Sequence, residues 1–316
     1  MNKKIGVFSF ADKIPNIALE KISKYYSKKG YFVFENNYNL LDEYEKIFIS
    51  IIFDWDLIKL SRFKKHFKKT IIGGSAYNEN TKLPEEIESI KPKINIGYST
   101  RGCIRTCPWC SVWRREGNTK IVNDLYDLWD GKTKDITLLD NNILAEKEHF
   151  KTICNQAIKE NIRLNFYQGL DHRLLNDENC KLLRKISHRR LRFSFDQSKY
   201  KEGVVKAIDM LNKHNLKNST WFVLVGFNET FEKDLERVNL LKEKKQDVYI
   251  ARYNFTRDTK YIPFCKWINH RKNFNSMTWE QYITQYNLKK QNKKGGGNKK
   301  QHNTKVLNFT TQSRHL

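Results

Sequence analysis

Residues 101–117 read RGCIRTCPWCSVWRREG and hold three of the six cysteines of the chain. Cys103, Cys107 and Cys110 follow the spacing C-x3-C-x2-C, and Trp109 stands directly before the third thiol. Three thiolates on one short loop can bind three corners of an iron–sulfur cluster. No other cysteine follows within the next forty residues, so one iron would stay open to a small ligand. This pattern favours a catalytic cluster over an electron-transfer cluster.

A zinc site is the alternative for the same loop, because zinc also binds closely spaced cysteines. A structural zinc ion takes four ligands, whereas neither His nor Cys occurs between Cys110 and His149. A non-enzymatic nucleic-acid-binding protein with a structural zinc is therefore the second hypothesis.

Short apolar runs alternate with helical patterns on both sides of the loop. Strands are expected at residues 94–99, 135–139, 163–167, 191–195, 220–225 and 248–252. Helices are expected at residues 146–160, 177–187, 203–214 and 230–244. Six parallel strands with helical crossovers in about 160 residues predict a partial (β/α)6 barrel of the TIM type.

The cysteine loop and the six βα units together resemble the radical S-adenosylmethionine superfamily, over most of residues 1–275. The resemblance implies that Cys103, Cys107 and Cys110 bind one [4Fe–4S] cluster whose open iron chelates S-adenosylmethionine. Reduction by an external donor of the flavodoxin or ferredoxin type would then yield a 5′-deoxyadenosyl radical. That radical would abstract hydrogen from a substrate that the sequence does not identify, with nucleic acid as one candidate.

Residues 1–93 are expected to form a separate Rossmann-like domain ahead of the barrel domain at residues 94–275. Apolar strands are predicted at residues 4–10, 31–35, 46–53 and 70–72, and a basic amphipathic helix at residues 56–68. The domain resembles the cobalamin-binding domain that precedes many radical barrels. The family's D-x-H-x-x-G motif is missing, since no Asp stands two residues before His66. We therefore expect a scaffold without cobalamin.

Polar side chains follow several of the expected barrel strands, where the loops of such a barrel build its site. In the family, similar positions hold the ammonium, ribose or adenine of S-adenosylmethionine. The cofactor-binding candidates are Trp109, Asp140, Asn141, Asn142, Gln168, Asp196 and Gly226. Asx turns and helix N-caps are the structural alternatives for the polar ones. Arg173 would pair with a ligand carboxylate or form a salt bridge, and Arg252 and Asn254 would face substrate.

The other three cysteines are not grouped in the sequence. Cys154 and Cys180 lie in helical patterns and are expected in the core, and Cys265 lies near the end of the barrel. A second cluster is therefore not expected. This weakens another alternative, a methylthiotransferase-like RNA-modifying enzyme, because that family holds an auxiliary cluster with additional cysteines.

The net charge is +24, which favours a polyanionic partner such as nucleic acid. Residues 276–316 are expected to form a basic extension, and from Lys289 onward it has seven lysines, one arginine and no acid. Disorder is the first interpretation of residues 288–316, and a grip on a phosphate backbone is the second. No apolar run is long enough for a membrane span, and a cytoplasmic location is expected.

Overall fold

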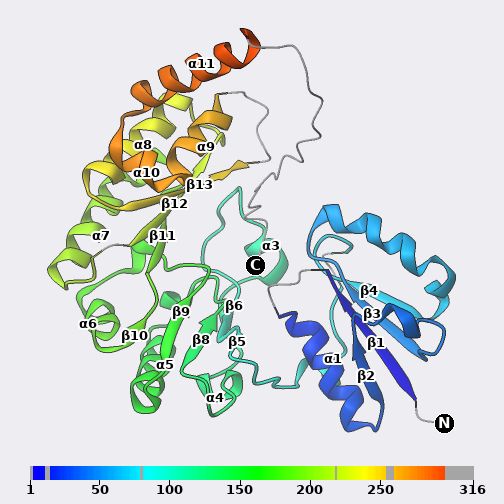
Figure 1. Ribbon diagram of the computed structural model, residues 1–316. Coiled ribbons are helices and arrows are strands. Elements are labelled where there is room, and N and C mark those ends of the chain that lie inside the picture. The colour runs from blue at the N-terminus through cyan, green and yellow to red at the C-terminus, as the bar shows by residue number, and fades with distance from the viewer. Residues whose placement is uncertain (1–2, 11–14, 79–80, 218, 254–259, 296–316) are drawn as a thin grey trace. The chain divides into compact units, whose positions relative to one another are not determined.

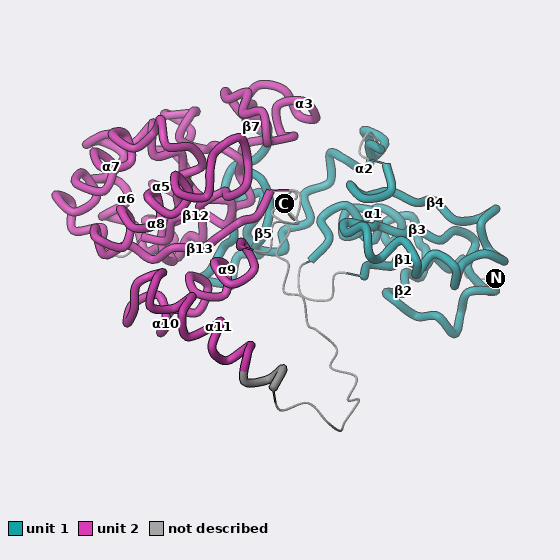
Figure 2. Tube along the Cα trace, turned by 90° about the horizontal axis from the view of Figure 1, so that it is seen from above, with its two compact units in different colours: residues 1–99, 122–137 teal, residues 100–121, 138–316 magenta. Residues whose placement is uncertain are grey.

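The computed structural model describes residues 3–10, 15–78, 81–217, 219–253 and 260–295. The chain is a mixed α/β protein whose sheets are mostly parallel, as the sequence predicts. Figure 2 shows two compact units. The first comprises Met1–Ser99 and Val122–Thr137, and the second comprises Thr100–Ile121 and Leu138–Leu316. The division differs from the expected domains in placing residues 94–99 and 122–137 with the first unit.

The first unit is built on a four-stranded parallel sheet (Figure 1). Its strands are β1 (Lys4–Ser9), β2 (Phe32–Glu35), β3 (Lys46–Ser50) and β4 (Thr70–Gly73), in the order β2-β1-β3-β4. Residues of β1 alternate between the two faces, because successive side chains of a strand point to opposite sides. All four strands were expected from their apolar runs.

Helices pack on both faces of this sheet. On one face, α1 (Ile17–Lys28) adds Leu19 and Ile22 to a cluster that includes Ile5 of β1, and α2 (Glu85–Glu88) lies on the same side. On the other face, η2 (Asp54–Lys69) adds Phe63 to a cluster with Phe8. The rings of Phe8 and Phe63 meet edge to face, with centroids 4.9 Å apart.

Element η2 is a 3₁₀ helix of sixteen residues rather than the α-helix that the sequence suggests. A run of this length is uncommon for this helix type. The two buried residues, Asp56 and Phe63, are seven apart. This spacing is about two turns at the α-helical period of 3.6 but does not fit a period of 3.0, so the burial pattern indicates an α-helix.

The remaining strands form two further sheets and a small ribbon. One sheet has the order β10-β9-β8-β5, and its strands are β5 (Ile96–Gly97), β8 (Asp135–Leu138), β9 (Arg163–Phe166) and β10 (Ser187–His188). The other has the order β11-β12-β13 and is parallel, with β11 (Arg192–Ser194), β12 (Thr220–Val225) and β13 (Asp247–Arg252). The strands expected of the barrel are thus present, as two sheets.

Helices follow most of these strands, close to the expected bounds. They are α4 (Leu125–Leu128), α5 (Lys147–Glu160), α6 (Asp177–Lys185), α7 (Lys201–Lys213), α8 (Phe231–Glu243), α9 (Tyr261–Asn269), α10 (Arg271–Ser276) and α11 (Trp279–Gly295). Cys154 of α5 and Cys180 of α6 are fully buried, which confirms them as core residues.

Helix α11 reaches Gly295, so the expected disorder is wrong for residues 288–295. Its first residue, Trp279, packs its ring 5.3 Å from that of Phe264 and 5.6 Å from that of Phe231. This aromatic contact anchors the helix start, and the good helix formers that follow can continue it. Residues 296–316, which carry the rest of the predicted basic tail, lie outside the described residues.

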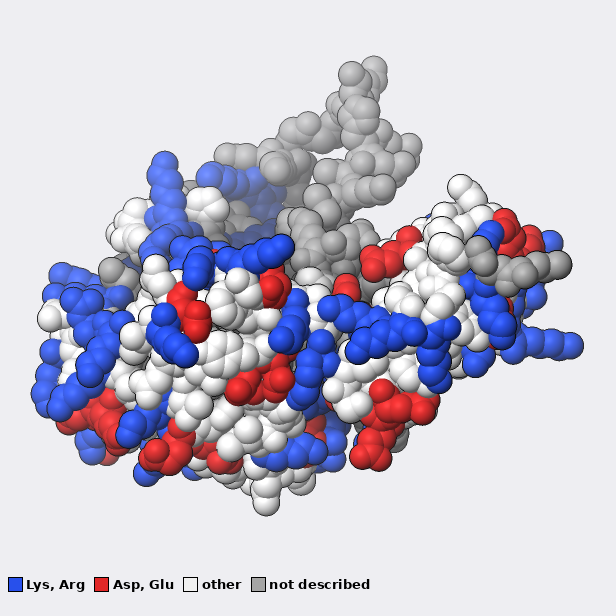
Figure 3. All heavy atoms as spheres, turned by 90° about the horizontal axis from the view of Figure 1, so that it is seen from below, with Lys and Arg blue, Asp and Glu red and all other residues white. Residues whose placement is uncertain are grey.

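Lys and Arg side chains are spread across the face drawn in Figure 3, with smaller groups of Asp and Glu between them. The excess of cations is therefore not confined to the tail. Among the helices that the structure describes, none is long and apolar enough to cross a membrane.

Candidate metal centre

A short antiparallel ribbon closes the cysteine loop at its base. Strand β6 (Thr100–Arg101) pairs with β7 (Lys120–Ile121). Beyond the ribbon, the amide of Cys103 donates to the carbonyl of Gly117 at 3.0 Å. The two ends of the loop are thereby held together, and the three cysteines project from a closed turn.

Glu116, at the end of α3 (Val112–Glu116), ties this turn together. Its carboxylate accepts hydrogen bonds from Arg101 at 2.9 Å, from the Gly102 amide at 2.9 Å and from the Asn141 side chain at 3.1 Å. Burial would raise the pKa of Glu116, but the bonds from Arg101 and Gly102 outweigh it and the pKa lies below its ordinary value. An ionised Glu116 therefore fixes the base of the loop.

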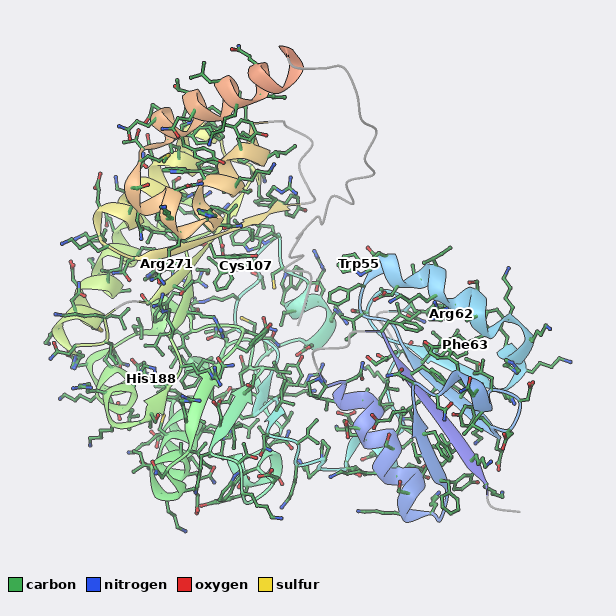
Figure 4. All side chains as sticks on the ribbon, viewed as in Figure 1. Trp55, Arg62, Phe63, Cys107, His188 and Arg271 are labelled. Atoms are coloured by element: carbon green, nitrogen blue, oxygen red, sulfur yellow. The ribbon has the colours of Figure 1, made fainter. Side chains whose placement is uncertain are left out.

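The three thiols lie on this one loop, and none is in a disulfide. The amide of Cys110 donates to the carbonyl of Cys107 at 3.0 Å, and the Trp113 indole donates to the same oxygen at 3.1 Å. Burial raises the pKa of Cys107 and Cys110, and the charge of a neighbouring thiolate raises both further. Figure 4 labels Cys107 on this loop.

Asn142, one of the predicted cofactor-binding residues, contacts a cysteine of the loop directly. Its side-chain amide donates to the Cys103 sulfur at 3.5 Å and to Asp171 at 3.2 Å. Its carbonyl oxygen is buried and has no hydrogen-bond partner among the described residues. A buried oxygen without a donor costs free energy, so this atom is ready to accept a bond from a bound molecule.

Asp171 joins the loop to the segment after β9. Its buried carboxylate accepts from Arg105 of the cysteine loop at 3.0 Å and from two nitrogens of Arg173 at 2.7 Å and 3.1 Å. Burial opposes its charge, but the two guanidinium groups hold the pKa of Asp171 below its usual range. Arg173 thus forms a salt bridge, one of its two expected roles, and it also lies beside Cys107.

Trp109 packs against the ends of the β11-β12-β13 sheet. Its ring meets Phe227 edge to face with centroids 5.3 Å apart, and Phe227 in turn meets Tyr253 at 4.6 Å. Leu224 and Ala251 complete this apolar cluster. The aromatic residue of the cysteine motif therefore serves as an apolar wall between the loop and the carboxyl ends of β12 and β13.

Two other predicted cofactor-binding residues, Asp140 and Asn141, form hydrogen bonds to residues at the two ends of the cysteine loop. Asp140 is 3% exposed and accepts from the Thr100 hydroxyl at 2.6 Å and from the Thr100 amide. Asn141 donates to Glu116, as described above. These contacts tie the end of β8 to the start of the cysteine loop.

Gln168, Asp196 and Gly226 follow β9, β11 and β12. The side-chain nitrogen of Gln168 is buried without a hydrogen-bond partner among the described residues. Burial raises the pKa of Asp196, whose charge in turn raises the pKa of Cys107 and Cys110. Gly226 has φ 75° and donates its amide to Asp234 at 3.0 Å.

The structure thus brings Asn142 to the Cys103 sulfur, and the charge of Asp196 acts on Cys107 and Cys110. Gly226 precedes Phe227, whose ring contacts Trp109. Arg252 ends β13, and Asn254 lies outside the described residues. Arg105 and Glu116 were missed from the sequence. Charged residues in a polar loop look like solvated side chains, and only the folded chain brings Arg105 to Asp171.

Among the described residues, no three His, Cys, Asp or Glu side chains are grouped so that they could hold one metal ion. In an iron–sulfur cluster, by contrast, each cysteine binds a different iron. No protein-family model matches the chain, and the comparison with curated proteins found no match.

Proposed function

We propose that the chain is a radical S-adenosylmethionine enzyme in which Cys103, Cys107 and Cys110 hold one [4Fe–4S] cluster. The observation that carries the proposal is the closed loop with three thiols at C-x3-C-x2-C spacing, none of them in a disulfide. The donor set fits such a cluster, since thiolates are its ligands and three of them leave one iron open. When bound, the cluster and S-adenosylmethionine would supply a 5′-deoxyadenosyl radical for hydrogen abstraction.

The chain's own residues would shape the surroundings of that open iron. Asn142 presents a buried oxygen without a partner next to Cys103, which suits an ammonium donor. Gln168 presents a buried amide nitrogen, which suits a hydroxyl or carboxylate acceptor. The wall of Trp109 and Phe227 would exclude water from the site.

The fold supports the proposal at two points. The six main strands β5, β8, β9, β11, β12 and β13 keep their sequence order within two sheets, and we propose that they form the partial barrel of the superfamily. In the first unit, the parallel order β2-β1-β3-β4 suits a Rossmann-like scaffold. A flavodoxin or ferredoxin would deliver the electron in the cytoplasm.

The proposal is tested by reconstituting the chain with iron and sulfide without oxygen, reducing it, and measuring 5′-deoxyadenosine formed from S-adenosylmethionine. Cys103→Ala, Cys107→Ala and Cys110→Ala should each abolish the product. Cys265→Ala is the matched control, because this thiol is also partly buried but lies in α9. Equal product from the loop variants and the control would refute the assignment of the three cysteines.

A further inference from the structure

The 3₁₀ helix η2 carries a second surface with a distinct arrangement of side chains. Three residues complete one turn of such a helix, so residues spaced by three lie above one another. One row comprises Leu57, Leu60, Phe63, His66 and Lys69. Its centre, Phe63, is fully buried and Leu60 packs against the same cluster, whereas Leu57 at the start of the row is 37% exposed. Figure 4 labels Phe63 together with Arg62 and Trp55 of the same element.

The second row is open to solvent and carries three large apolar side chains. It comprises Trp55, Ile58, Ser61, Lys64 and Phe67. Trp55 is 51% exposed, Ile58 77% and Phe67 48%. Single exposed apolar residues are ordinary, but several on one row mark an interaction site.

Trp55 is also held in a defined orientation. Its ring stacks on that of Phe53 with centroids 4.6 Å apart and planes 7° apart. The pair presents a rigid aromatic platform at one end of the row. A ring that is already oriented loses little conformational entropy when a planar group stacks on it.

The third row is cationic and runs beside the second row. It comprises Asp56, Lys59, Arg62, Lys65 and Lys68. Asp56 is buried and pairs with Lys59 at 2.7 Å, while Arg62, Lys65 and Lys68 are exposed. At about 2 Å of rise per residue, these three cations follow one another at steps of about 6 Å.

We propose that η2 binds single-stranded nucleic acid, with bases stacked on the Trp55 platform and phosphates along the row of Arg62, Lys65 and Lys68. Aromatic side chains beside a cationic track are the means by which proteins grip single strands without sequence preference. The charge of +24 supplies the long-range attraction. This surface lies in the first unit and does not depend on the cluster chemistry proposed above.

The test uses the full-length chain and a fluorescently labelled single-stranded RNA of mixed sequence, about 20 nucleotides long. Anisotropy is measured over a series of salt concentrations. The variant Arg62→Gln/Lys65→Gln/Lys68→Gln should weaken binding and make the slope of log K against log salt shallower by about 2, since each phosphate contact on a single strand contributes about 0.7. The matched control, Lys28→Gln/Lys82→Gln/Lys206→Gln, removes three exposed lysines elsewhere.

A second pair of variants tests the platform. Trp55→Ala should weaken binding by about 5-fold to 150-fold, which corresponds to one stacked base, and Trp55→Phe should restore part of the affinity. Tyr77→Ala is the control, because Tyr77 is 50% exposed in the same unit but lies outside η2. Neither control should change the affinity by more than about 2-fold.

The result that would overturn the proposal is equal weakening by the η2 variants and their controls, because binding would then follow total charge alone. Absence of RNA binding at low salt would overturn it as well. So would binding to vesicles rich in phosphatidylserine without binding to RNA, since the exposed row would then serve a lipid surface. All these measurements use protein without a cluster, so they stand apart from the test of enzymatic activity.

Discussion

Arg237 of α8 is the centre of a buried ionic network next to the proposed site. Its side chain is 2% exposed and pairs with Asp234, which is fully buried, and with Glu229 at 3.2 Å. It also donates to the backbone carbonyls of Phe195 and Leu224, at the ends of β11 and β12. The guanidinium therefore joins two neighbouring strands at the edge that faces the cysteine loop.

Replacing Arg237 with Met leaves Asp234 as a buried carboxylate that has lost its cation. Burial already raises the pKa of Asp234, because a charge in this environment is disfavoured. Removing one partner of a buried pair costs about 3–5 kcal/mol. The amides of β12 should then lose protection against hydrogen exchange by roughly two to four orders of magnitude.

The measurement is native-state hydrogen exchange of β12, compared between the parent chain and Arg237→Met. Arg271→Met is the matched control: Arg271 makes an arginine–aspartate pair with Asp247 at 2.6 Å, but its side chain is 65% exposed. An exposed pair contributes only about 0–1 kcal/mol. Equal changes of protection in the two variants would refute the reasoning that burial decides the cost.

Two further predictions concern the cysteine loop and a buried histidine. Gly102→Ala should destabilise the loop and reduce its iron uptake, because Gly102 has φ 83° and an added Cβ would lie 2.3 Å from the Asn118 carbonyl oxygen. Gly117→Ala, with open space around its Cβ, should take up more iron than Gly102→Ala. Equal iron uptake by the two variants would contradict this prediction. Burial lowers the pKa of His172 to about 4, so the folded state favours the neutral imidazole. Its contribution to the free energy of unfolding is therefore fully present above pH ~6.5 and is lost as the pH falls toward 4. The total loss is about 3 kcal/mol. Urea unfolding at pH 7 and pH 4.5 should show a smaller loss for His172→Phe than for the parent chain; parallel losses would contradict this prediction.

The parallel α/β character could be predicted because buried parallel strands read as continuous apolar runs. The KIFIS stretch of β3 has four buried residues out of five, and such a run admits few other interpretations. The helix type of η2 could not be predicted, because the spacing of seven between its two buried residues, Asp56 and Phe63, suits the α-helical period. The helical state of residues 288–295 was missed because their polar composition hides the anchoring of α11 by Trp279.

The candidate site was predictable only in part. Spacing and thiol chemistry single out Cys103, Cys107 and Cys110 without any knowledge of the fold. The pairing of Arg105 with Asp171 joins residues 66 positions apart, and no local pattern encodes it. Asp140 was predicted as a cofactor-binding residue from its place after a strand. In the structure its carboxylate accepts from Thr100, and only the folded backbone defines that contact.

The most direct test of the central claim is the metal content of the chain purified without oxygen. A [4Fe–4S] cluster on the loop predicts about four irons and four sulfides per chain, and their loss in the variant Cys103→Ala/Cys107→Ala/Cys110→Ala. About one zinc per chain without iron would contradict the account and would identify the loop as a structural zinc site.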